Sequence, residues 1–134
     1  MARIKLREKY GDGIFARQVI NQAVRKLKTH NTVVIEGMRS LVEYKIFKNC
    51  FSNIFVIFIE ADKVVRFKRL MERRIRSLSL EEINKRDNYE IKVLLIDKLK
   101  DYTDFFVQNN GSKADLYKNL KNILETVSND SIKN

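Results

Sequence analysis

Proline is absent from these 134 residues and glycine occurs only four times, so the sequence favours helices and few tight turns. The single cysteine cannot form an internal disulfide, and with one histidine the chain holds no Cys/His metal cluster. The apolar runs are too short and too interrupted by charge to span a membrane, and the first residues lack the apolar core of a secretory signal. The sequence therefore predicts a cytoplasmic protein with no membrane partner and no metal site of its own.

Negative charge is scarce relative to positive charge. There are 27 Lys and Arg residues against 17 Asp and Glu, which gives a net charge of +10. Nucleic acid, an anionic membrane surface or a phosphorylated small molecule would each suit such a chain. A hydrophobic content of 44% is typical of a globular domain with its own core. We expect one domain over residues 1–127 and a polar tail over residues 128–134.

Apolar patterns predict strands that are separated by helices. Short unalternated apolar runs predict three strands, over residues 32–37, 54–59 and 105–108. Helical spacing predicts helices over residues 2–10, 12–27, 40–49, 63–76, 79–99 (with a break near Asn88) and 112–127. Capping boxes begin three of these helices, at Ser40, Ser79 and Ser112. Strands that alternate with helices pair in parallel, so the expected fold class is α/β.

The stretch from Thr32 to Ser40 carries the strongest site signal. Its apolar run leads directly into Glu36, Gly37 and Arg39. Polar groups at the carboxyl end of a parallel strand lie where open α/β sheets bind ligands. Gly37 permits a sharp turn or a close approach to a ligand, and Arg39 can hold a phosphate or carboxylate with two hydrogen bonds. The same residues also fit a plain strand end with a salt-bridged loop, and their spacing favours neither interpretation.

Three arginines share one face of the helix predicted over residues 63–76. Arg66, Arg69 and Arg73 lie almost opposite its apolar side. Adjacent cations repel each other unless an anion or carboxylates lie nearby, and Glu72 or acidic residues further along the chain could serve. The pattern fits either an anion-binding face or a solvated basic surface.

Five segments together resemble an archaeal nucleotide-kinase-like family that is related to dephospho-CoA kinase and adenylate kinase. They are YGDGIFAR at residues 10–17, VVIEGMRS at 33–40, RLMER at 69–73, INKRD at 83–87 and TDFFVQNNGSKADLYKNLKNIL at 103–124. Each motif is short, but the five occur in the family's order and cover nearly the whole chain. The resemblance implies a three-layer P-loop kinase-like fold with a mainly parallel sheet and a helical lid over about residues 63–100. It implies ATP and Mg²⁺ as the cofactors of the intact family.

The resemblance also assigns roles to residues. The acceptor's anionic group would be bound by Arg17, Gly37 and Arg39. Glu36 would bind the magnesium shell or orient the attacking hydroxyl. The transferred phosphoryl group would be surrounded by Arg69, Arg73 and Arg86. The nucleotide's adenine would lie beside Asn109, Asn110, Gly111 and Ser112. Positioning and cationic stabilisation of this kind are what phosphoryl transfer requires.

Three features depart from the family pattern. Glu36 stands where the related motif has an aspartate, and residues 93–96 contain no glycine after the lid. No G-x-x-x-x-G-K-[ST] phosphate-binding loop occurs anywhere in the sequence. Because that loop supplies the backbone cradle and the lysine that neutralise a triphosphate, we expect no ordinary ATP-dependent turnover. The family's first strand, phosphate loop and second strand have no counterpart, so the chain is expected to be N-terminally truncated, with no cofactor certain.

The sequence thus favours a nucleotide-binding, kinase-like protein that is inactive or incomplete as this chain. Its ligand would be a nucleotide or another phosphorylated small molecule. A missing first strand would leave open sheet edges, so that the strands at 32–37 and 54–59 pair directly or the chain forms a homodimer. One alternative is a basic nucleic-acid-binding protein, although the sequence has no RNA-binding aromatic motif and no helix-turn-helix signature. The other is an interaction protein whose sheet accepts a strand from a partner.

Overall fold

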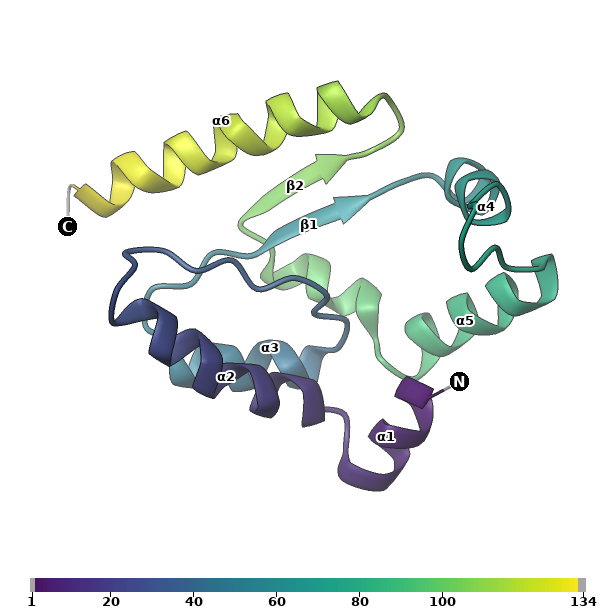
Figure 1. Cartoon of the computed structure of the whole chain (residues 1–134), viewed down its shortest axis with the longest axis horizontal. Coiled ribbons are helices and arrows are strands. Elements are labelled where there is room, and N and C mark those ends of the chain that lie inside the picture. The colour runs from purple at the N-terminus through teal and green to yellow at the C-terminus, as the bar shows by residue number, and fades with distance from the viewer. Residues whose placement is uncertain (1, 133–134) are drawn as a thin grey trace. The chain divides into compact units, whose positions relative to one another are not determined.

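The computed structural model describes residues 2–132 (Figure 1). The chain divides into two compact units. The first unit contains the chain up to Ile54 together with Asn88–Leu99. The second unit contains Phe55–Asp87 and the chain from Lys100 onward. No linker or change of composition in the sequence marks this division.

The first unit is built from helices. They are α1 (Ala2–Tyr10), α2 (Ile14–Leu27), α3 (Leu41–Cys50) and the end of α5 (Leu80–Lys92), followed by the start of a 3₁₀ helix, η1 (Ile96–Tyr102). Helix α2 contacts both α1 and α3, and Ala16, Ala23 and Phe47 are buried. A Cβ atom on Gly13 would collide with Cδ1 of Ile46, so a side chain at residue 13 would require that of Ile46 to move. The helices predicted over residues 2–10, 12–27 and 40–49 are confirmed to within two residues.

The strand predicted over residues 32–37 is wrong. This segment carries no strand assignment, and the sheet that the described residues form has two strands. The backbone turns at Gly37, where φ is +84°, and the side chain of Val34 is 78% exposed. A strand is stable only when neighbours satisfy its backbone N–H and C=O groups. An apolar run reveals how a segment would pack but not whether such neighbours exist.

The second unit contains a parallel pair of strands. β1 (Ile57–Glu60) pairs with β2 (Phe105–Gln108), in a register that places Ile57 opposite Phe105 and Glu60 opposite Gln108. Helix α4 (Lys63–Met71) and the first part of α5 lie between the strands in the chain, and α6 (Lys113–Ile132) follows β2 and contacts it. The rings of Phe58 and Phe106 stack with centroids 5.8 Å apart. The predicted α/β class and parallel pairing are confirmed in this unit, and β2 has the predicted bounds. β1 begins at Ile57 instead of residue 54, and its expected direct pairing with residues 32–37 is wrong.

Three helix boundaries differ from the prediction. α4 ends at Met71 instead of residue 76. The chain turns back after the helix, and the N–H of Leu78 donates to the carbonyl of Leu70 at 3.3 Å. α5 continues through Asn88 without a break, but it ends at Lys92 instead of residue 99. α6 extends through the expected polar tail to Ile132, and residues 133–134 lie outside the described part.

The three predicted capping boxes are confirmed. In each, the serine Oγ accepts the N–H of the third following residue, whose carboxylate accepts the serine N–H. The pairs are Ser40 with Glu43, Ser79 with Glu82, and Ser112 with Asp115. They fix the starts of α3, α5 and α6. Over residues 2–132, no helix combines the length and apolarity needed to cross a membrane.

Candidate functional site

Hydrogen bonds join the last residues of β1 and β2 and the turns that follow them. The N–H of Asn109 donates to the carbonyl of Glu60 at 2.6 Å, which extends the ladder by one residue. The N–H of Asp62 donates to Oδ1 of Asn110 at 2.8 Å, and Nε2 of Gln108 donates to Oδ1 of Asp62 at 2.9 Å. This edge of the sheet is where parallel strands present residues to a ligand. We call the segment Asn109–Ser112 the edge loop.

Arg69 of α4 holds the edge loop through two hydrogen bonds. Its Nη1 donates to the carbonyl of Asn109 at 2.6 Å, and its Nη2 donates to the carbonyl of Gly111 at 2.8 Å. A planar guanidinium with fixed donors suits two carbonyl oxygens of one turn. A residue predicted for catalysis and a loop predicted for nucleotide binding therefore lie together. In this arrangement Arg69 shapes the loop through its carbonyl groups.

The far end of the edge loop is fixed by the cap of α6. Oδ2 of Asp115 accepts hydrogen bonds from Oγ of Ser112 at 2.6 Å and from its N–H at 2.9 Å. These bonds, first to the Ser112 side chain and then to its backbone, hold the pKa of Asp115 below the ordinary value of 3.8. A Cβ atom on Gly111 would lie 2.9 Å from the same carboxylate oxygen, so the loop has little space for a side chain there.

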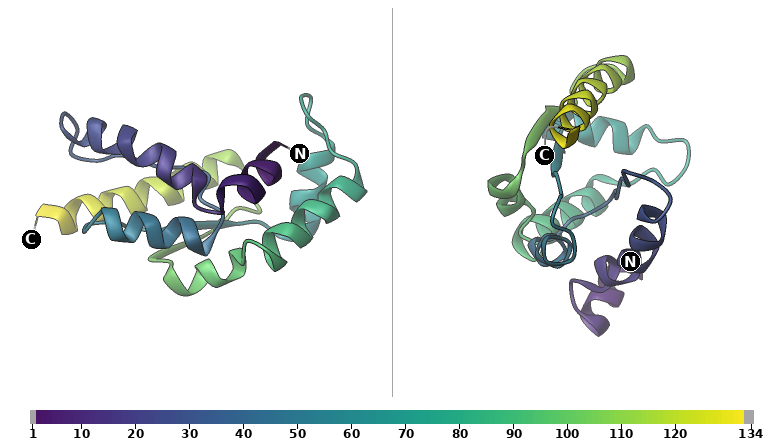
Figure 2. Two further views of the ribbon diagram at one scale, coloured as in Figure 1. Left: turned by 90° about the horizontal axis from the view of Figure 1, so that it is seen from below. Right: turned by 90° about the vertical axis from the view of Figure 1, so that its left-hand side faces the viewer.

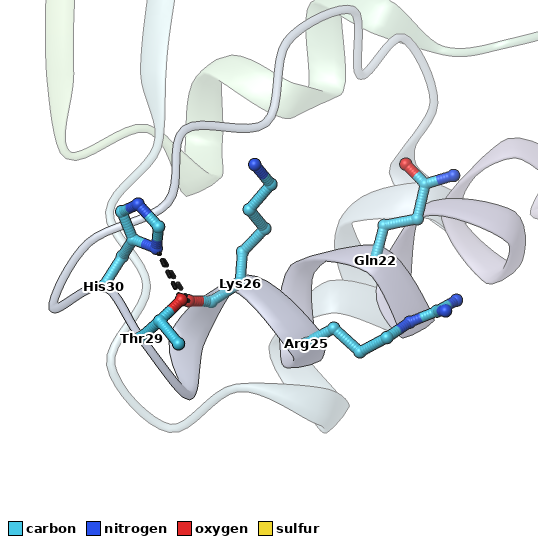
Figure 3. A pocket seen from close by; sticks show the side chains of 5 residues that line it. All are labelled: Gln22, Arg25, Lys26, Thr29 and His30. Atoms are coloured by element: carbon cyan, nitrogen blue, oxygen red, sulfur yellow. Dashed lines mark hydrogen bonds between the residues drawn. The ribbon is translucent and has the colours of Figure 1, made fainter.

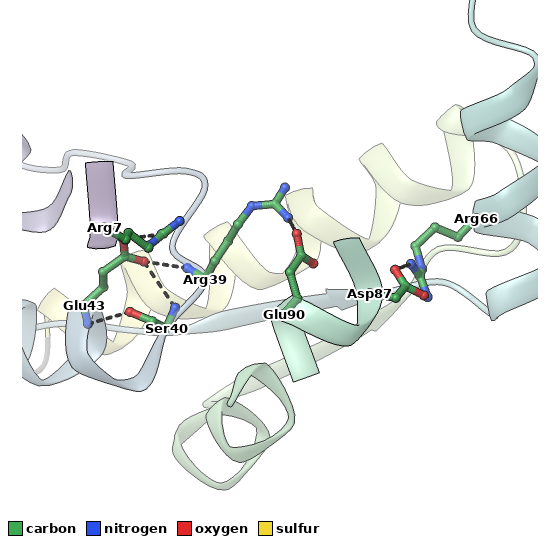
Figure 4. A network of polar contacts seen from close by, with 7 residues as sticks. All are labelled: Arg7, Arg39, Ser40, Glu43, Arg66, Asp87 and Glu90. Carbon is green, nitrogen blue, oxygen red and sulfur yellow. Dashed lines mark hydrogen bonds and ion pairs between the residues drawn. The ribbon is translucent and has the colours of Figure 1, made fainter. Parts of the chain in front are cut away.

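The predicted face of three arginines is wrong, because α4 ends before Arg73. Arg66 forms a two-bond ion pair with Asp87 of α5, and its Nη2 lies 2.9 Å from Oδ2 (Figure 4). Arg69 holds the edge loop, and Arg73 is exposed in the segment after the helix. Arg86 is half-buried on α5. Arg66, Arg69 and Arg73 therefore each have a different environment. Asp87 is the downstream carboxylate that pairs with Arg66.

Arg39 belongs to a network of polar contacts in the first unit (Figure 4). Its main-chain N–H donates to Oε2 of Glu43 at 2.8 Å, and its guanidinium forms an ion pair with Glu90 of α5. The other oxygen of Glu43 accepts from Nη2 of Arg7 at 2.7 Å, and both side chains of that pair are at most 4% exposed. Arg39 therefore has the salt-bridged position that the sequence left as an alternative to anion binding.

The other residues predicted on the acceptor side have separate environments. Nη2 of Arg17 donates to the carbonyl of Tyr10 at 3.0 Å. Gly37 has the left-handed backbone conformation, and no atom lies within 4 Å of the position that a Cβ would occupy there. Glu36 is exposed, and no contact among the described residues joins its carboxylate to Arg17 or Arg39. The left-handed turn at Gly37 agrees with the sharp turn that the sequence suggested.

The buried partnership between Arg7 and Glu43 has no signal in the sequence. The capping box predicts only that Glu43 caps α3, and its second bond reaches 36 residues back along the chain. The guanidinium of Arg7 also lies over the ring of Phe15, 4.8 Å from its centroid.

Tyr89 of α5 is half-buried in the same unit. Burial raises the pKa of Tyr89, and the negative charge of Asp12 raises it further. Burial of this kind depends on tertiary packing, so a linear pattern of charges does not predict it.

A pocket at the end of α2 contains none of the predicted site residues (Figure 3). Its volume is about 460 Å³, and it is lined by Gln22, Arg25, Lys26, Thr29 and His30. Nδ1 of His30 lies 2.8 Å from Oγ1 of Thr29. Cations at the C-terminal end of a helix complement its dipole, and the carbonyls there disfavour an anionic ligand. In the part of the chain with described side chains, no group of three His, Cys, Asp or Glu residues could hold a metal ion.

The chain is similar to archaeal proteins. It is 31% identical over 134 residues to UPF0200 proteins of Saccharolobus islandicus and Saccharolobus solfataricus, and the match covers 97% of this chain and 67% of theirs. The chain belongs to the UPF0200 family. A UPF0200/UPF0201 protein of Archaeoglobus fulgidus is 36% identical over 123 residues, which are 90% of this chain and 38% of that protein. No family model matches the chain.

Membership of the UPF0200 family confirms the archaeal affiliation that the motifs suggested. The names of these UPF0200 relatives state no substrate, cofactor or reaction. The chain spans only 38% of the Archaeoglobus protein and about two thirds of the Saccharolobus proteins. The link to dephospho-CoA kinase and adenylate kinase stays a prediction.

Proposed function

We propose that this UPF0200 chain binds a nucleotide, or a related phosphorylated small molecule, at the edge loop. The proposal places it among nucleotide-kinase-like and dephospho-CoA-kinase-like proteins with a three-layer P-loop kinase-like fold. The observation that carries the proposal is the pair of hydrogen bonds from Arg69 to the carbonyls of Asn109 and Gly111. These bonds hold the edge loop at the carboxyl end of a parallel strand pair. The edge loop is the segment that the resemblance places beside the adenine of the nucleotide.

The physical setting of the edge loop supports a ligand with a planar base and negative charge. The loop leads into the N-terminus of α6, a 20-residue helix whose dipole favours negative charge at that end. Backbone groups that are already held in a fixed turn can bind the edge of a base without the entropic cost of ordering the loop. Arg73 is exposed beyond the end of α4 and adds a cation for phosphate.

The resemblance assigns acceptor binding and a magnesium ligand to Arg17, Glu36, Gly37 and Arg39, which all belong to the first unit. Mg²⁺ in phosphoryl-transfer proteins is commonly held by one or two carboxylates together with the phosphates of the substrate. The exposed carboxylate of Glu36 fits the role of a single protein ligand of that kind, and the ion would neutralise phosphate charge. Arg17 would contact the acceptor's anionic group, and Arg39 would have to exchange its ion pair with Glu90 to do so.

The residues present lack the loop that holds the triphosphate of ATP in position for phosphoryl transfer. No G-x-x-x-x-G-K-[ST] loop occurs in the sequence, so neither its backbone cradle nor its lysine is available to the β- and γ-phosphates. We therefore propose ligand binding without ATP-dependent phosphoryl transfer by these 134 residues. A Mg²⁺-dependent rate of ATP hydrolysis well above the rate without protein would contradict this part of the proposal.

Thermal unfolding with added ligand tests the binding. A ligand at 100 times its dissociation constant stabilises the folded state by about 2.7 kcal/mol. ADP, ATP or dephospho-CoA is expected to raise the melting temperature in a saturable manner, and Arg69→Ala is expected to remove most of the rise. Arg25→Ala, in the pocket at the end of α2, is the matched control and is expected to retain it. No saturable rise with any of the three ligands at millimolar concentration would overturn the proposal.

Homodimerisation through the sheet edges is part of the same proposal. Each strand of the β1–β2 pair has one neighbour among the described residues, and both strands are rich in apolar side chains. A melting temperature that rises with protein concentration in the absence of ligand would support a dimer. A melting temperature independent of concentration, together with a monomeric mass in solution, would contradict it.

A further inference from the structure

A basic loop joins α4 to α5. We call residues 72–78 the arginine loop, and within it Arg73, Arg74 and Arg76 are exposed. Ile75 lies between the arginines with 80% of its side chain exposed. Figure 2 shows this segment projecting beyond the end of α4 in both views. A single exposed aliphatic side chain is common on protein surfaces, but here three arginines lie within two residues of it in the chain.

The base of the arginine loop is closed. The N–H of Leu78 donates to the carbonyl of Leu70 at 3.3 Å, so the two ends of the loop meet. The exit is fixed by the reciprocal cap of Ser79 and Glu82, with bonds of 2.9 and 3.3 Å. Arg76 turns the chain with a left-handed φ of 58°. The tip is therefore presented on a defined base and is not the frayed end of a helix.

The charges at the tip have no partner within the described part of the chain. Neither a hydrogen bond nor an ion pair joins the guanidinium groups of Arg73, Arg74 and Arg76 to the described residues. Glu72 is the only carboxylate in the loop, so the loop carries a net charge of about +2 by this count of its ionised side chains. Like charges this close repel each other, and a polyanion would relieve the repulsion.

We propose that the arginine loop binds the backbone of a single-stranded nucleic acid. A small phosphorylated ligand needs a concave site, whereas this tip projects. A membrane surface requires more buried apolar area than the one side chain of Ile75 supplies. Guanidinium groups pair with phosphate oxygens through two hydrogen bonds. In a single strand the faces of the unpaired bases are open to contact with Ile75. In a duplex the bases are stacked inside, so Ile75 would meet only the charged phosphates.

This inference does not depend on the proposed nucleotide site, because Arg74, Ile75 and Arg76 have no role there. The test uses the full chain and a fluorescein-labelled oligouridylate of about 20 nucleotides. Binding is followed by fluorescence anisotropy over a series of salt concentrations. Each phosphate contact to a single strand contributes about 0.7 to the slope of log affinity against log salt. The double variant Arg74→Ala/Arg76→Ala is expected to weaken binding about tenfold or more at low salt and to reduce the slope by about 1.4.

The matched control is Lys45→Ala/Lys48→Ala on α3, which removes the same charge from two exposed side chains. It is expected to retain most of the affinity. Ile75→Ala is expected to weaken binding to the single strand several-fold and to leave binding to a duplex of the same length unchanged. Equal losses in the two double variants would overturn the proposal, since diffuse charge would then explain the binding. Binding to phosphatidylserine vesicles without binding to the oligonucleotide would also overturn it. Circular dichroism establishes that each variant is folded.

Discussion

Arg69 and Gly111 are 42 residues apart in the sequence, and Nη2 of Arg69 lies 2.8 Å from the carbonyl oxygen of Gly111. A second donor of the same guanidinium bonds the carbonyl of Asn109. One exposed side chain of α4 therefore bonds two carbonyl groups of the edge loop. The first prediction concerns this relationship.

Arg69→Ala should release the edge loop. Because Arg69 is exposed, the global free energy of unfolding should fall by only about 1 kcal/mol or less. Hydrogen exchange of the amides from Asn109 to Ser112 should accelerate much more than that of the α6 interior. Arg73→Ala is the control, and it should leave exchange in the loop unchanged. Unaltered exchange in Arg69→Ala would show that the two hydrogen bonds do not order the loop.

The buried pair of Arg7 and Glu43 should stabilise the first unit only while both charges are present. Arg7→Met leaves the carboxylate of Glu43 buried without its partner, and such a loss costs about 3–5 kcal/mol. Adding Glu43→Gln neutralises the site and keeps an oxygen for the cap of α3. The double variant should therefore be more stable than Arg7→Met alone, as measured by urea denaturation. A double variant that is less stable than Arg7→Met would contradict this description of the pair.

Gly37→Ala should destabilise the protein through the backbone alone. The φ of Gly37 is +84°, and no atom lies within 4 Å of the position that a Cβ would take. A left-handed conformation costs an ordinary L-residue about 1–2 kcal/mol, and asparagine tolerates it better. Urea denaturation should accordingly rank the wild type above Gly37→Asn and Gly37→Asn above Gly37→Ala. Equal stability of all three proteins would show that the turn relaxes to another conformation.

The cap of α6 should make stability depend on pH in the acidic range. The pKa of Asp115 in the folded protein lies below its ordinary value of 3.8, chiefly because Ser112 donates hydrogen bonds to the carboxylate. The carboxylate therefore contributes stability above about pH 4, and the contribution is lost as the pH falls through the lowered folded pKa. Asp115→Asn should flatten this part of the stability profile. Glu125→Gln on the same helix is the control, and an equal flattening there would refute the assignment to the cap.

Local signals predicted the helices of this chain well. Capping boxes at Ser40, Ser79 and Ser112 depend on residues three apart, so the sequence contains the whole interaction. The strand at Phe105–Gln108 was also predicted correctly. The segment 32–37 has a stronger apolar run, yet it forms no strand among the described residues, because a strand also needs partners that a local pattern does not specify.

The candidate site was predictable only in part, for a similar reason. The sequence placed Arg69 and the edge loop in one proposed site, and their contact agrees with that expectation. It did not reveal that Arg39 pairs with Glu90 or that Arg66 pairs with Asp87. These partners lie 51 and 21 residues away, and many carboxylates in the chain would have fitted equally well before folding.

Titration of the ¹⁵N-labelled chain with ADP, followed by two-dimensional NMR, tests the proposed nucleotide site most directly. Saturable changes in chemical shift are predicted for the amides of Asn109, Asn110, Gly111 and Ser112 and for the side chain of Arg69. Residues 74–76 of the arginine loop, which have no role in the proposed nucleotide site, and the pocket at the end of α2 should change little. Saturable changes confined to the pocket residues, or no change in the edge loop at millimolar ADP, would contradict the proposal.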